Sequence, residues 1–320
     1  MIPRQKPSYG PVFLPPSAPL WLSERDSAAD EAEAAFTAGA ALAVIDAIVL
    51  AEPIWGGAWR NRLALRCATQ SVRFAGRAEG EAELRDGWAM LRSGDDPGPA
   101  GHVLLAWRRL AAGSTKRLAA MQADDVGALA DALGVRRYAA LADLPHWFDQ
   151  LAAGNRAAPL AALELLRRIM ADHPSAEPLA WWMADLLLAR KFGWRVPVPL
   201  LMAERYGKPL RGGPRGRIAP DEPQFPRGFL STATVAGLSA ARLATDVARR
   251  AQSLTAAAPK LRAKGAADVI DGLLGDDALP GSFRSPRLSR FASRRLFDRL
   301  LEFGVVRELS GRSAFRVFGL

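Results

Sequence analysis

The sequence is poor in the residues that usually build metal, disulfide and nucleophile sites. Cys67 is its single cysteine, and its three histidines, His102, His146 and His173, lie far apart. A single cysteine excludes an intramolecular disulfide framework and favours a reducing compartment. No pair of these residues has metal-ligand spacing, and no glycine-rich nucleotide motif opens an expected helix. We therefore expect no metal and no cofactor.

Tyrosines and runs of β-branched residues are also scarce, whereas alanine and leucine are abundant. This composition favours helices, and 320 residues are enough for two domains. The N-terminus has no apolar run beside its first basic residues and is rich in proline before Trp21, so no secretory signal is expected. The sequence predicts a mainly α, cytoplasmic protein.

One apolar stretch has the composition of a membrane span. Residues 34–51 contain only Thr37 and Asp46 as clearly polar residues. An aspartate deep in the bilayer costs about 2.5–3.5 kcal/mol on insertion scales. The segment is therefore expected to be a buried core helix, and no membrane partner is expected.

Turn residues divide the chain into three parts. Residues 1–22 form a proline-rich arm that either wraps the body or stays disordered. Residues 23–259 form a helical body, and residues 260–320 form a C-terminal domain. An apolar strand is expected at 196–202. Helices of the body are expected at 26–51, 58–76, 79–91, 125–133, 144–152, 158–170, 177–191 and 230–257.

A basic loop rich in glycine and proline interrupts the body at residues 211–228. Its Gly212-Gly213 pair would offer main-chain N–H groups to a phosphate. The spacing of a P-loop is absent, however. A flexible, solvated insertion is the favoured interpretation, and a phosphate-binding loop is the alternative.

The last 37 residues carry nine arginines against three acids, which accounts for +6 of the net charge of +10. A helix is predicted from Ser289, a good N-cap, to Gly304, a good C′ residue. Two short apolar strands are expected at 305–309 and 314–318, joined by a turn. A helix, a glycine stop and a basic hairpin form the pattern of a winged helix-turn-helix.

Helical spacing separates the apolar and basic sides of this helix. Ala292, Leu296, Leu300 and Phe303 are expected to face the core, with Arg299 close to them. The basic end is the N-terminal end, which enters the major groove in helix-turn-helix proteins. We expect nucleic-acid contacts from Arg287, Arg290, Arg294, Arg295, Arg307, Arg312 and Arg316.

A helix-turn-helix also needs helices before the recognition helix. Residues 266–274 supply one, which Gly275 ends. The next segment, residues 276–286, contains Pro280 and Pro286, so its helix is expected to be short or distorted. The alternative interpretation of the arginines is a solvated helix that docks on the rest of the protein.

The stretch His173-Pro-Ser-Ala-Glu177 precedes an apolar helix. A histidine at such a junction can be a general base, although a cap or turn residue is the favoured role. The stretch resembles the signature of Fic (filamentation induced by cAMP) proteins, His-Pro-Phe-x-Asp/Glu-Gly-Asn-Gly-Arg. Pro178 to Trp181 replace Gly-Asn-Gly-Arg, so the side chains that grip nucleotide phosphates in that family are absent here.

Two other regions are similar to Fic chains. The C-terminal hairpin is similar to the wing that closes many of them, and Ser71-Val-Arg-Phe-Ala-Gly76 is similar to their inhibitory Ser-x-x-x-Glu-Gly motif, with Ala75 in place of the glutamate. The resemblance implies a degenerate Fic-like core in the body. The whole chain also resembles an uncharacterised bacterial family, a domain of unknown function, which implies no activity.

These observations favour a DNA-binding protein, a transcriptional regulator or a factor associated with plasmids or mobile elements. The helical body would serve a homodimer or a protein partner. One alternative is a protein-interaction module of the toxin–antitoxin type, in which the arginines bind an acidic partner. The other is a divergent Fic-like nucleotidyl transferase that uses His173, although His173 is predicted not to be catalytic.

Overall fold

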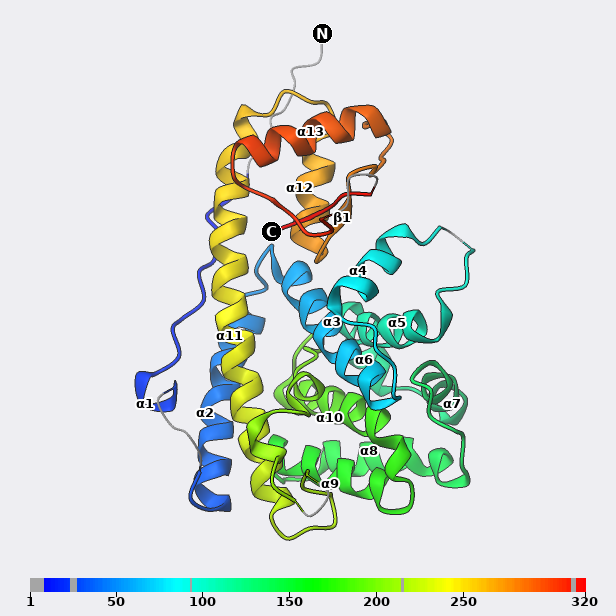
Figure 1. Cartoon of the computed structure of the whole chain (residues 1–320). Helices are drawn as coiled ribbons and strands as arrows, with labels where there is room; N and C mark the ends of the chain where they lie inside the picture. Colours follow the sequence, from blue (N-terminus) through cyan, green and yellow to red (C-terminus); the bar gives the residue numbers. More distant parts are fainter. Residues whose placement is uncertain (1–8, 24–27, 93, 214–215, 312–314) are drawn as a thin grey trace.

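The computed structural model describes residues 9–23, 28–92, 94–213, 216–311 and 315–320. These residues form a mainly helical molecule with one small antiparallel sheet near the C-terminus (Figure 1). The α-helices of the body are α1 (Leu20–Ser23), α2 (Glu31–Leu50), α3 (Gly56–Phe74), α4 (Glu81–Met90), α5 (Gly98–Ala112), α6 (Thr115–Ala119), α7 (Ala123–Ala132), α8 (Leu144–Ala153), α9 (Ala158–Asp172), α10 (Glu177–Phe192) and α11 (Phe225–Ala257).

The C-terminal unit contains α12 (Ala266–Gly275), α13 (Arg290–Glu302) and the strands β1 (Leu279–Pro280), β2 (Arg307–Glu308) and β3 (Val317–Gly319). Short 3₁₀ helices connect several elements: η1 (Ala139–Asp143), η2 (Pro174–Ala176), η3 (Leu201–Glu204), η4 (Lys208–Leu210) and η5 (Ala258–Lys260). The predicted mainly α fold is therefore confirmed, and the expected helices of the body are present with shifted ends.

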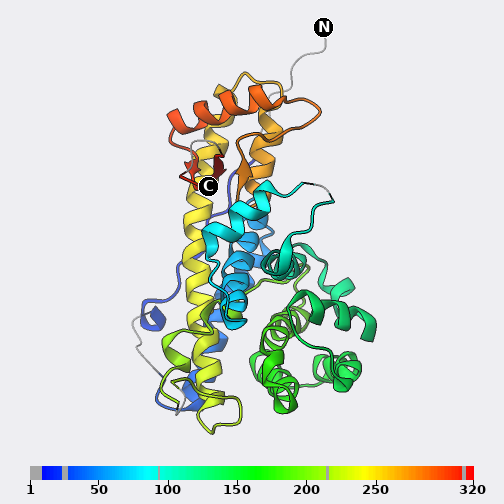
Figure 2. The ribbon, with the colours of Figure 1, turned by 45° about the vertical axis from the view of Figure 1, so that its right-hand side comes forward.

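Helix α11 is the longest element and runs along one side of the molecule, with α2 beside its lower half (Figures 1 and 2). It begins at Phe225, earlier than expected, because Pro226 fits the first turn of a helix. The two helices approach closely at Gly237, where an added Cβ would lie 3.0 Å from the Cβ of Ala41. A glycine at this position therefore allows α2 to pack tightly on α11.

Helix α2 is the apolar segment that was expected to lie in the core. Asp30 caps it by accepting a hydrogen bond from the N–H of Glu33, and Leu42 and Ile45 are fully buried. The carboxylate of Asp46 accepts a hydrogen bond from Trp194 Nε1 at 2.8 Å. Within the described ranges α2 is one helix whose length and composition would suit a membrane span. Only 39% of this apolar span is buried, and Phe36 and Leu50 are exposed, so one face of α2 lies in the core and the rest lies at the surface.

Helix α10 occupies the centre of the body. Its side chains are buried on every side from Glu177 to Ala189, which suits a helix that is apolar all round. Its buried Asp185 accepts hydrogen bonds from the N–H groups of Leu200 and Leu201, at 2.8 and 3.2 Å. Burial raises the pKa of Asp185 to about 8. The strand expected at 196–202 is wrong, because Asp185 rather than a neighbouring strand takes up these N–H groups.

The described part of the N-terminal arm follows the first alternative, because it packs against the molecule. Trp55 Nε1 donates to the carbonyl of Phe13 at 3.0 Å, and the hydroxyl of Tyr9 donates to Asp271 of α12 at 2.8 Å. The arm therefore joins the body to the C-terminal unit.

The described part of the 211–228 loop is also packed in places. Ile218 is buried, and its N–H donates to the carbonyl of Leu210 at 3.0 Å. The guanidinium of Arg217 lies 3.7 Å from the ring centre of Tyr206. Much of the predicted insertion is thus held against the body, and its last residues belong to α11.

The C-terminal sheet has the order β1-β3-β2, with both pairs antiparallel. Arg307 pairs with Gly319 and Glu308 with Phe318, so the expected hairpin is present in a shorter form. The expected second helix at 276–286 is wrong, because this segment contains β1 and turns instead. Pro280 cannot donate a main-chain hydrogen bond inside a helix, and Leu279 and Pro280 pair with β3 instead.

Candidate functional site

Helix α13 begins and ends where the sequence predicts. The Ser289 hydroxyl accepts a hydrogen bond from the N–H of Ala292 at 3.3 Å, and Gly304 has a φ of +66° just after the helix. A left-handed φ favours glycine because a Cβ would be strained there. The predicted start, stop and positive φ are all confirmed.

The buried face of α13 differs from the expected one. Its fully buried residues are Ser293, Leu296, Phe297 and Leu300. Phe297 stacks on Phe318 of β3 with ring centres 4.5 Å apart. The sheet therefore turns the buried face away from Ala292 and Phe303, which are half-buried. Arg299, expected close to this face, is exposed and pairs with Glu302 at 2.6 Å.

The first two turns of α13 expose a basic outer side. Arg290, Arg294 and Arg295 are exposed, and none of them forms an ion pair with a described residue. Phe291 lies among them with 65% of its surface exposed. The acids Asp298 and Glu302 lie further along the helix, so the positive charge is concentrated at its N-terminal half. A helix N-terminus adds a partial positive charge at the same place.

An open groove of about 900 Å³ adjoins this N-terminus. Its cationic lining consists of Lys264, Arg284, Arg287 and Arg290, with Phe291 beside them. Arg287 pairs with Asp268 at 2.5 Å. Asp268 also accepts a hydrogen bond from the Ser285 hydroxyl, and these two contacts, the serine bond first, lower the pKa of its carboxyl group. The groove is thus basic even though Arg287 is itself paired.

The remaining candidate arginines lie apart from this groove. Arg316 binds both Asp298 and Glu308 at 2.8 Å, so two carboxylates take up its charge. Arg307 of β2 is exposed on the body side, near Arg62 and Arg250, whose pKa values are lowered first by burial and then by the charge of Arg307. Arg312 lies outside the described residues. The structure therefore brings Arg287 and Arg290 together in this groove. Arg294 lines a second hollow with Asp298 and Arg316, Arg295 is exposed on the same helix, and Arg307 lies on β2.

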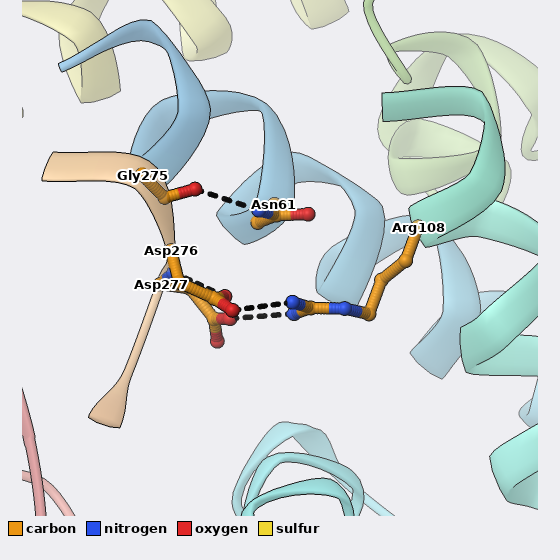
Figure 3. Close-up of polar contacts among 5 residues, drawn as sticks. All are labelled: Asn61, Arg108, Gly275, Asp276 and Asp277. Carbon is orange, nitrogen blue, oxygen red and sulfur yellow. Dashed lines mark hydrogen bonds and ion pairs between the residues drawn. The ribbon is translucent and has the colours of Figure 1, made fainter. Parts of the chain in front are cut away.

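A buried ion-pair cluster fixes the C-terminal unit on the body (Figure 3). Arg108 of α5 reaches the two carboxylates that follow α12, Asp276 at 2.6 Å and Asp277 at 2.9 Å. Asn61 of α3 donates to the carbonyl of Gly275 at 3.1 Å. Burial, together with the neighbouring Asp276, raises the pKa of Asp277. Sequence reasoning missed this cluster because its partners are far apart in the chain and form no local pattern.

Further contacts from the body hold the sheet side of the C-terminal unit. Arg85 of α4 donates to the carbonyl of Leu309 at 2.8 Å, and Arg62 of α3 donates to the main-chain oxygen of Leu320 at 3.0 Å. An added Cβ at Gly57 would lie 2.5 Å from the carbonyl oxygen of Gly275, so α3 and α12 are in close contact. Helix α13 lies on the opposite side and faces away from the body (Figures 1 and 2).

The residues that resemble Fic motifs make packing and ion-pair contacts inside the body. Glu177 is buried, binds Arg205 through both carboxylate oxygens and accepts a hydrogen bond from Trp181 Nε1 at 3.0 Å. The ring of His173 lies 3.7 Å from the ring of Tyr138, centre to centre. The hydroxyl of Ser71 accepts a hydrogen bond from Trp107 inside the core. These contacts do not confirm the Fic resemblance.

The fold defines a mainly helical protein with a small α/β unit at its C-terminus, whose outward helix carries arginines without ion pairs to the described residues. The family of proteins of unknown function DUF1403 matches residues 9–320, so the chain belongs to that family. No curated protein matches the chain. The predicted membership of an uncharacterised family is confirmed, and the family description assigns no activity.

Proposed function

We propose that the protein binds duplex DNA through the N-terminal half of α13. The observation that carries this proposal is the exposed group Arg290, Arg294 and Arg295, which forms no ion pair with the described residues. Unpaired arginines are costly to gather unless a polyanion neutralises them, and phosphates are their commonest partners in DNA complexes. Lys264 and Arg284 in the adjoining groove extend the same positive surface.

The order of elements supports the proposal. A helix, a strand, a second helix and a hairpin follow one another from α12 to β3, and the hairpin pairs with the first strand. This order is similar to that of a winged helix, except that the helix usually found between the first strand and the recognition helix has no counterpart between β1 and α13. In such proteins the N-terminal residues of the recognition helix contact base edges. The anchoring of the sheet side on the body leaves α13 accessible to a duplex.

The two rival functions would rely on different residues and different chemistry. An acidic protein partner, as in a toxin–antitoxin pair, would use the arginines without a phosphate backbone. A nucleotidyl transferase would need a phosphate site beside His173, where Pro178, Leu179 and Ala180 offer no polar side chain. A transcriptional or plasmid-associated role would follow from DNA binding.

The double substitution Arg290→Ala, Arg294→Ala tests the proposal. Each phosphate contact contributes roughly 0.9 to the slope of log affinity against log salt on B-DNA, so the double variant should lose about 1.8 from that slope. Its affinity for duplex DNA should fall at every salt concentration. Fluorescence anisotropy with a labelled duplex measures both quantities, and circular dichroism checks the fold.

The double variant Arg137→Ala, Arg156→Ala is the matched control. It removes the same charge from two exposed, ion-paired arginines of the body, which lie outside α13 and its groove. It should bind DNA with the wild-type slope. Equal binding by the α13 variant and the wild type would show that α13 is not the contact surface.

A further inference from the structure

A pocket of about 360 Å³ lies on the body, well away from the arginine-rich helix in the sequence and on another set of elements. It opens between α2, the first half of α11 and the segment around η4. Its volume falls within the range of small-molecule sites. The DNA-binding proposal uses none of the residues that line it.

Helix α11 makes two close contacts with neighbouring elements, one on each side of this pocket. At Gly228 an added Cβ would lie 3.0 Å from both Leu210 Cδ2 and the carbonyl of Pro209. At Gly237 it would lie 3.0 Å from Ala41 of α2. Gly237 follows Gly228 by nine positions, which corresponds to a rise of roughly 13 Å along the helix. The backbone of α11 is therefore pinned to η4 at one end and to α2 at the other, and the pocket lies between the two contacts.

The floor of the pocket is apolar and its mouth is cationic. Leu22, Ile218 and Leu238 are buried, and Val235 adds a partly exposed methyl surface. Arg211 and Arg227 lie at the edge and are exposed. The described lining contains no aspartate or glutamate. An apolar floor beneath Arg211 and Arg227, which form no ion pair with a described residue, suits a ligand with one apolar end and one anionic end.

The polar groups of the pocket retain unused hydrogen-bonding capacity. Arg227 uses Nη1 to donate to the carbonyl of Ala29 at 3.1 Å, and Arg211 donates to the carbonyl of Tyr206 at 3.2–3.3 Å. Neither arginine forms an ion pair with a described residue. The half-buried Ser231 hydroxyl has no hydrogen-bond partner in the described part of the chain. A carboxylate at the mouth would therefore find two guanidinium groups already positioned by main-chain contacts.

We propose that this pocket binds a small amphipathic carboxylate, with its apolar chain against Leu22, Ile218 and Leu238 and its carboxylate at Arg227 and Arg211. The main-chain bonds of both arginines hold the guanidinium groups at the edge before the ligand arrives, which lowers the entropic cost of binding. A charge-assisted hydrogen bond to a carboxylate then fixes the orientation of the ligand.

Calorimetric titration of the whole protein with decanoate tests this inference, with decylamine as the cationic counterpart of the same length. Decanoate should bind with one site per chain and decylamine should not. Arg227→Gln keeps a donor for Ala29 but removes the charge, so it should weaken decanoate binding by about tenfold or more. Val235→Trp should abolish binding because the indole fills the partly exposed side of the pocket.

Arg249→Gln is the matched control, because Arg249 is an exposed arginine of the same helix outside the pocket. It should bind decanoate as the wild type does. Circular dichroism shows whether each variant keeps its fold. Absence of decanoate binding to the wild type, equal binding of decylamine, or wild-type affinity in both Arg227→Gln and Val235→Trp would overturn the inference. The DNA-binding proposal would be unaffected by any of these results.

Discussion

Replacing Glu177 with alanine is expected to destabilise the protein by about 3–5 kcal/mol, the usual cost of removing one partner of a buried ion pair. Glu177 and Arg205 have side chains only 4% and 7% exposed, so neither charge has water to replace its partner. Trp181 Nε1 would lose its acceptor at the same time. Urea denaturation followed by tryptophan fluorescence measures the loss.

The double variant Glu177→Leu, Arg205→Met removes both charges together and should be much more stable than Glu177→Ala alone. Apolar replacement of a whole buried pair is often neutral or better. His173→Ala should cost far less than Glu177→Ala, because the half-buried His173 contacts the Tyr138 ring and carries no buried charge pair. A fully stable Glu177→Ala protein would contradict the structural role given to this motif.

Replacing Arg108 with alanine is expected to loosen the C-terminal unit, at a cost also of about 3–5 kcal/mol. The change leaves Asp276 and the buried Asp277 side by side without the guanidinium that joins them to α5. Hydrogen exchange should show faster exchange of the main-chain N–H groups of β3. Arg109→Ala is the control, because Arg109 is the neighbouring exposed arginine of the same helix.

The destabilisation caused by Arg108→Ala should increase with pH. Burial holds the pKa of Asp277 above its ordinary value, so the folded state binds this proton more tightly than the unfolded chain does. The contribution of Asp277 to stability therefore falls as pH rises from its ordinary pKa through the raised one. Without Arg108 this fall should steepen, so Arg108→Ala should be less destabilising at pH 5 than at pH 8. A loss that is equal at both pH values would contradict the assignment.

Local sequence chemistry predicted the ends of α13 well. Ser289 and Gly304 act within one turn of chain, so their capping roles are visible from neighbouring residues alone. The sequence likewise predicted an apolar helix after His173, and α10 forms there. These features depend on contacts that are close in the sequence.

Features that depend on distant partners were not predictable in the same way. The buried face of α13 includes Phe297 because β3 presents Phe318 to it, and β3 is placed by the pairing with Leu279 and Pro280. The strand expected at 196–202 failed because Asp185, in another helix, takes its N–H groups. The number of arginines in the C-terminal segment also did not indicate that Arg316 forms ion pairs with Asp298 and Glu308.

Binding of duplex DNA to the whole wild-type protein, measured between 50 and 200 mM salt, tests the central claim most directly. Arg284, Arg290, Arg294, Arg295 and Lys264 provide about five cations for phosphates, so the slope of log affinity against log salt should be roughly −4 to −5. A polyglutamate competitor should displace the duplex poorly. No binding at the lowest salt, or a slope near zero, would contradict the proposal and leave the arginines of α13 to an acidic protein partner.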